Sequence, residues 1–268
     1  MSKIKAAFRP ILFGILIIVT ILFLTVLGST LNFSDLATYL TIQLGLIIVT
    51  LLLIPTVKKE YGIDIKEHID YKSLSFRSIF SLIILTIAIE LLFIQLEGIA
   101  MLRTGEATSS SAPRAMSVLI ASYLFGICVA PIIEEIVCRV IMIESCKTEI
   151  GAVFSIILTS LIFSLIHLRG LFPTVHIFIT ALLLGYVYIK TNNAAYTMIM
   201  HCTTNLLLII LDLLYWFGLP VYKVINGVTV INGYLLAATI IAAITTSVSY
   251  KMIKKGNRKS VELGEEVY

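Results

Sequence analysis

Long apolar stretches separated by short polar segments run along the whole chain. Read in windows of about 20 residues, the length at which an apolar helix crosses a bilayer, this pattern predicts about eight membrane-spanning helices. They are expected near residues 10–28, 36–57, 78–96, 115–143, 151–168, 172–190, 194–217 and 230–252. The sequence shows no internal repeat. We therefore expect one domain, residues 1–268, with its motif core at 115–217. The predicted fold class is an all-α, polytopic membrane protein.

Composition narrows the class further. Of the 268 residues, 59% are hydrophobic and 13% are charged, and the mean hydropathy is +1.02. A soluble globular domain has about 25% charged residues, so this composition excludes a soluble domain.

Lysine and arginine are divided unevenly between the loops. Most of the 20 fall on one side of the predicted membrane, whereas the loops on the other side hold only Arg103, Arg114, Arg169 and Lys223. Because cytoplasmic loops carry the excess of positive charge, we expect both termini to lie in the cytoplasm. These flanking residues also explain the net charge of +4, so we expect no nucleic-acid partner.

Two adjacent carboxylates and an arginine interrupt the fourth apolar stretch. A charged residue at the centre of a membrane helix costs about 2.5–3.5 kcal/mol on insertion scales, so Glu134, Glu135 and Arg139 need a role. Glu135 and Arg139 are four residues apart, in the order that favours an ion pair on one helix face. Glu134 is rotated by about 100° and lacks that partner, which suits a general acid or base. We therefore assign Glu134 to chemistry and the other two residues to structure.

Two further apolar stretches each carry a histidine with a partner four residues away. The fifth ends in Phe163 and His167, and the seventh contains His201 and Asn205. Residues four apart share a helix face. A carboxylate and an imidazole can deprotonate water, while a second imidazole and an amide can donate hydrogen bonds to the oxygen of a tetrahedral intermediate. The residue types therefore match a hydrolytic site.

Other polar residues in the apolar stretches are less informative. Glu90, in the third predicted helix, is left unassigned, and His176, near the start of the sixth, is predicted to be structural. The four cysteines show no C-x-x-C spacing, so no thiolate metal site is predicted.

The ordered motifs resemble the CPBP family of intramembrane proteases, also called Abi, which is related to the type 2 CAAX prenyl endopeptidases. The motifs are Glu134-Glu135 with Arg139, Phe163 with His167, and His201 with Asn205. The resemblance implies an eight-helix endopeptidase with its catalytic cavity inside the bilayer. It further implies that Glu134 and His167 activate water and that His201 and Asn205 stabilise the oxyanion. Glu135, Arg139 and Phe163 would then support the site.

The residue types leave the cofactor open. Glu134, His167 and His201 form a two-histidine, one-carboxylate set of the kind that catalytic zinc uses. No H-E-x-x-H motif is present, however, and the three residues come from separate predicted helices. The motifs are equally compatible with a metal-free mechanism, so zinc is a possible rather than a required cofactor.

Three function classes fit an intramembrane polar cluster. The first is an endopeptidase, in a bacterial plasma membrane, whose partners are the lipid bilayer and a peptide or membrane-protein substrate. The second is a non-catalytic regulatory or bacteriocin-immunity protein of the same fold, which binds a partner. The third is a transporter or channel, which predicts discontinuous helices and an internal duplication, and this sequence shows no duplication. Because all motif positions are filled, we favour the endopeptidase.

Overall fold

The computed structural model describes residues 3–105, 123–167, 170–219, 221–225 and 228–231, together with some of those between 233 and 244. This part of the chain is helical apart from one short hairpin, which confirms the all-α class. Five of the helices described are long and apolar enough to cross a membrane. The chain is therefore an integral membrane protein, but the predicted count of eight spans is not confirmed.

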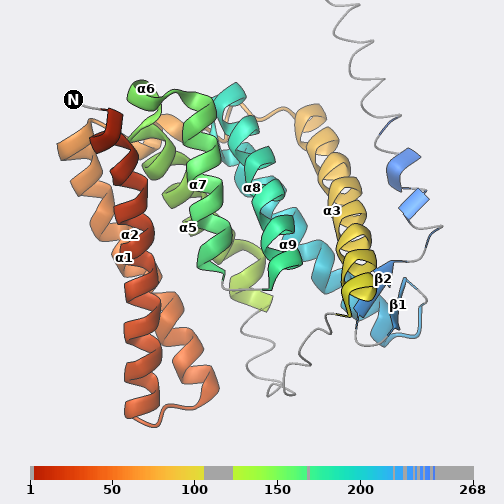
Figure 1. Cartoon of the computed structure of the whole chain (residues 1–268). Helices are drawn as coiled ribbons and strands as arrows, with labels where there is room; N and C mark the ends of the chain where they lie inside the picture. The colour runs from red at the N-terminus through yellow and green to blue at the C-terminus, as the bar shows by residue number, and fades with distance from the viewer. Residues whose placement is uncertain are drawn as a thin grey trace, which may run out of the picture.

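Six helices match the predicted apolar stretches closely (Figure 1). They are α1 (Lys3–Thr30), α2 (Asp35–Tyr61), α3 (Phe76–Thr104), α7 (Ala152–Ile166), α8 (Leu171–Thr191) and α9 (Ala194–Trp216). Two shorter helices, η1 (Ile65–His68) and α6 (Lys147–Ile150), lie between them. At 15 residues, α7 is the shortest of the six and reaches only about 22 Å.

The fourth predicted span is helical but not a single α-helix. Its described part consists of a π-helical turn, η2 (Phe125–Val129), a short α-helix, α5 (Ala130–Glu135), and a second π-helical segment, η3 (Ile136–Ile143). Residues 115–122 of the predicted span lie outside the described residues. The described part of the predicted span at 115–143 is thus helical, and it combines π-helical and α-helical segments. Single π turns inside α-helices often occur at functional sites.

The η3 segment forms the centre of the bundle. Every residue from 137 to 143 is buried, including Val140 and Ile141 at 0% exposure. Helix α7 packs between η3 and α8, and α9 packs against both α8 and α3. Helices α1 and α2 pair with each other at one side of the molecule, and α3 lies at the other (Figure 1). The charged motif thus lies where helices from most of the chain converge.

A β-hairpin follows α9. Strands β1 (Tyr222–Ile225) and β2 (Val228–Ile231) pair antiparallel, and β2 lies beside the C-terminal end of α3 (Figure 1). The backbone N–H of Ile231 donates to Oε1 of Gln95 at 2.9 Å, which attaches the hairpin to α3. The eighth predicted span, 230–252, begins inside strand β2. Most of its remaining residues lie outside the described part of the chain.

Candidate active site

The ion pair predicted in the fourth helix is present and fully buried. Nε of Arg139 lies 2.9 Å from Oε2 of Glu135, and both side chains have 0% exposure. The guanidinium carbon lies 5.9 Å from the centre of the Phe163 ring. Taking two charges out of water is costly, and close pairing offsets that cost. This pair therefore belongs to the protein interior, as the spacing of the two residues predicted.

His201 lies between the two adjacent glutamates. Its Nδ1 is 3.1 Å from Oε1 of Glu135, and its Nε2 is 3.5 Å from Oε2 of Glu134. The contact with Glu134 is the longer one, and this carboxylate keeps 34% of its side chain exposed. Arg139 pairs with Glu135 and not with Glu134, as predicted. Glu134 nevertheless has a neighbouring polar group, because α9 places His201 beside it.

The backbone of α7 fixes the orientation of His167. Nδ1 of His167 lies 2.8 Å from the carbonyl oxygen of Phe163, one turn earlier in the chain. A carbonyl oxygen can only accept, so Nδ1 must carry the proton in this contact. In the neutral ring, Nε2 is then unprotonated and able to accept a proton. The Phe163 ring packs edge-on against both His167 and His201, at 4.6 and 5.9 Å between ring centres.

Asn205 lies one turn beyond His201 on α9. Its Nδ2 donates to the carbonyl oxygen of Gly126 at 2.6 Å, so the side chain joins α9 to η2. An amide nitrogen carries two N–H groups. One contact with Gly126 therefore leaves a second donor on the same side chain.

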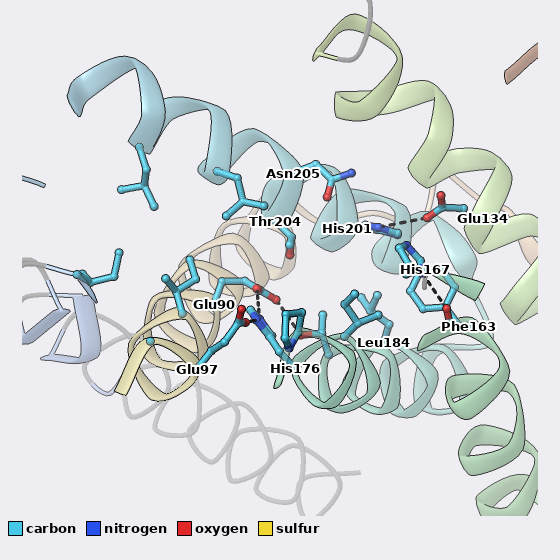
Figure 2. Close-up of a pocket in the computed structure, with 18 of the residues that line it drawn as sticks. Glu90, Glu97, Glu134, Phe163, His167, His176, Leu184, His201, Thr204 and Asn205 are labelled. Atoms are coloured by element: carbon cyan, nitrogen blue, oxygen red, sulfur yellow. Dashed lines mark hydrogen bonds and ion pairs between the residues drawn. The ribbon is translucent and has the colours of Figure 1, made fainter. Parts of the chain in front are cut away.

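The four predicted catalytic residues line one cavity of about 490 Å³. They come from three elements of the bundle: α5 supplies Glu134, His167 caps α7, and α9 supplies His201 and Asn205. Figure 2 shows these side chains gathered at one end of the cavity. Glu135 and Arg139 do not line it. The structure thus separates the two adjacent glutamates, one at the cavity and one behind it.

A second polar group at the other end of the cavity was not recognised from the sequence. His176 on α8 places Nε2 2.9 Å from Oε2 of Glu90 and Nδ1 2.8 Å from Oε2 of Glu97, both on α3 (Figure 2). The hydroxyl of Thr180 donates to the other oxygen of Glu90 at 3.0 Å. All four line the cavity. A signal was available: two carboxylates seven residues apart share one face of an apolar helix.

The described residues do not provide a metal site. No group of three or more His, Cys, Asp or Glu side chains among them is placed to hold a metal ion. The zinc set that the sequence left open, Glu134, His167 and His201, therefore does not fit the geometry of the described residues.

Comparison with known proteins supports the resemblance seen in the motifs. Residues 114–207 match the family model described as Type II CAAX prenyl endopeptidase Rce1-like. The matched region contains all three motifs and ends two residues after Asn205. No curated protein and no solved structure matches the chain.

Proposed function

Starting from the Rce1-like domain at residues 114–207, we propose that this chain is an intramembrane endopeptidase. It hydrolyses peptide bonds of membrane-associated peptides or proteins, in a bacterial plasma membrane. The observation that carries this proposal is the cavity of about 490 Å³, which is lined by Glu134, His167, His201 and Asn205. A carboxylate, two imidazoles and an amide in one concave site are the groups that acyl hydrolysis needs.

In the proposed first step, Glu134 and His167 activate a water molecule. The carboxylate of Glu134 accepts a proton from the water, while Nε2 of His167 accepts a hydrogen bond from its other O–H. The water oxygen bonds to the carbonyl carbon of the substrate, and the carbonyl π bond opens to give an oxyanion. The oxyanion then re-forms the C=O bond as the C–N bond breaks, and the new carboxylic acid of Glu134 donates its proton to the leaving amine.

In the same proposal, His201 and Asn205 stabilise the oxyanion. Nδ1 of His201 donates to Glu135 at 3.1 Å, and Nε2 lies 3.5 Å from Glu134. Because a neutral imidazole carries only one N–H, the proposal has His201 protonated on both ring nitrogens, so that Nε2–H donates to the oxyanion. Asn205 donates from the N–H that Gly126 does not use. Such donors act strongly where water is excluded, and removing one typically costs about 100- to 1,000-fold in rate.

The decisive experiment is cleavage of a panel of membrane-tethered peptides by the purified protein in detergent or nanodiscs. Wild type is compared with Glu134→Gln and with Glu60→Gln, a matched change at an exposed glutamate of α2. We expect Glu134→Gln to lose cleavage and Glu60→Gln to keep it. Cleavage that survives a zinc chelator supports the metal-free steps, whereas loss with chelator and recovery with zinc would overturn them.

The same panel tests the competing class. If wild type and Glu134→Gln behave alike on every peptide, and both confer the same phenotype in cells, the endopeptidase proposal falls. The regulatory or immunity function would then take its place.

A further inference from the structure

A glutamine on α2 faces the candidate active site from outside the main cavity. Gln43 lies on the same helix stripe as Leu46, Ile47 and Thr50, at the spacing of three and four residues that defines one helix face. Thr50 is 3% exposed, whereas Leu44 and Ile48, on the opposite stripe, are 57% and 47% exposed. Gln43 is thus on the face of α2 that packs toward α5. A polar side chain within a membrane helix usually faces the protein for a functional or structural reason.

A second, smaller cavity lies between α2 and α5. Its volume is about 40 Å³, and seven residues line it. Gln43 and Glu134 are the two with polar side chains, and the other five are aliphatic or alanine. Glu134 also lines the main cavity. Glu134 therefore borders both cavities, and Gln43 lines only the smaller one.

The size and lining of the small cavity suit water. A cavity needs a volume of about 10–15 Å³, measured as the space open to the centre of a water molecule, and two or more polar partners to hold one water. The volume of 40 Å³ accepts one or two waters but no substrate side chain. The Gln43 amide can donate to a water, and that water can donate to a carboxylate oxygen of Glu134. A bridging water is nearly as favourable as a direct hydrogen bond.

We propose that Gln43 is a positioning residue for Glu134. It holds a water in the small cavity, and this water fixes the orientation of the Glu134 carboxylate. This inference rests on the proposed function. Orientation matters because a general base acts only when its oxygen lies within hydrogen-bond reach of the proton that it removes. No contact between Gln43 and the substrate is required.

The structural test is a high-resolution crystal structure of wild type and of Gln43→Met, which replaces the amide by an apolar side chain of similar length. We expect a water peak within hydrogen-bond distance of both Gln43 and Glu134 in wild type, and no such peak in the variant. A dry small cavity in wild type would overturn the inference. This readout needs no activity.

The kinetic test uses Gln43→Met and, as a control, Leu46→Ala, which changes the wall of the same cavity but keeps the amide. We expect Gln43→Met to lower kcat about tenfold with KM unchanged, because only the base is misplaced. Leu46→Ala should retain at least half of the wild-type kcat. Equal losses in both variants, or no loss in Gln43→Met, would overturn the positioning role while leaving the endopeptidase in place. If wild type cleaves no peptide, the proposed function fails, and the positioning role in catalysis fails with it. The crystal structure alone then decides whether a water molecule joins Gln43 to Glu134.

Discussion

Asn205 donates to the carbonyl oxygen of Gly126 at the point where the fourth helix loses a backbone donor. In the π turn η2, the N–H of Ala130 bonds to the carbonyl of Phe125, five residues earlier. The next donor in that series would be residue 131, which is a proline and has no N–H. The side chain of Asn205 takes the place of the absent backbone donor. One residue thereby completes the hydrogen bonding of η2 and attaches α9 to it.

This relationship predicts a specific coupling between Asn205 and Pro131. Asn205→Ala leaves the Gly126 carbonyl without its partner and should cost about 1–3 kcal/mol of stability. Pro131→Ala restores a backbone N–H that can donate to the Gly126 carbonyl. The double variant Asn205→Ala/Pro131→Ala should therefore lose less stability than Asn205→Ala alone. Thermal unfolding in detergent measures the cycle.

Thr203→Val is the control for that cycle, because among the described residues the Thr203 hydroxyl donates to Ile199, within its own helix. It should be close to wild type. Full additivity of Asn205→Ala and Pro131→Ala would contradict the proposed replacement of one donor by the other.

The buried pair of Glu135 and Arg139 predicts a large asymmetry between single and double variants. Arg139→Met leaves a carboxylate at 0% exposure without its cation and should cost about 3–5 kcal/mol. Glu135→Leu combined with Arg139→Met removes both charges and should recover much of that loss. The melting temperature of each purified variant is the measurement. A double variant no more stable than Arg139→Met would argue against the pair as the source of the cost.

Cleavage by that double variant should nevertheless stay low. Glu135 also accepts from Nδ1 of His201 at 3.1 Å, so its removal frees the imidazole to turn. Stability and activity should therefore separate in this variant. Recovery of both together would show that Glu135 does not orient His201.

The group formed by His176, Glu90 and Glu97 should contribute to stability in a graded way. Thr180→Val removes one hydrogen bond to a carboxylate and should cost about 1.5–3 kcal/mol. His176→Leu removes both ring contacts and leaves Glu90, at 2% exposure, beside an apolar side chain, so its cost should be larger. Unfolding of the two variants side by side gives the order. A smaller loss for His176→Leu would mean that the imidazole does not join α3 to α8.

Close packing of α7 against α8 depends on Gly185. A Cβ at this position would lie 2.7 Å from Cγ2 of Ile156, so Gly185→Ala should cost about 1–3 kcal/mol. Ile156→Ala removes the opposing methyl group and should reduce the effect of the added one. Gly126→Ala is a matched control in a helix, because no atom of the described residues lies within 4 Å of a Cβ added there. Equal destabilisation by the two glycine variants would refute the packing argument.

Hydropathy predicted the long helices because each needs only a run of apolar residues. The ends of α8 and α9 fall within one residue of the predicted ones. The pairing of Glu135 with Arg139 was also predictable, since both lie on one helix and their spacing sets their relative direction. Such local relationships can be derived without knowing how helices pack.

Contacts between helices could not be derived in the same way. Hydropathy does not say which helices are neighbours, so it could not place His176 of α8 between two glutamates of α3. Nor does any residue pattern distinguish a π turn from an α turn in an apolar stretch, although Pro131 marks where a backbone donor is absent. The roles of Glu134, His167, His201 and Asn205 in catalysis stay predictions, now with a shared cavity to support them.

The π turn at Phe125–Val129 also sets the rotational phase of the fourth helix. Its hydrogen bonds join residues five apart rather than four, so compared with a regular α-helix it accommodates one additional residue. One residue corresponds to about 100° of rotation. Losing a single residue from this turn would therefore rotate Glu134, relative to the preceding segment, away from its present direction. The composition of the site would be unchanged, but its base would face a different neighbour.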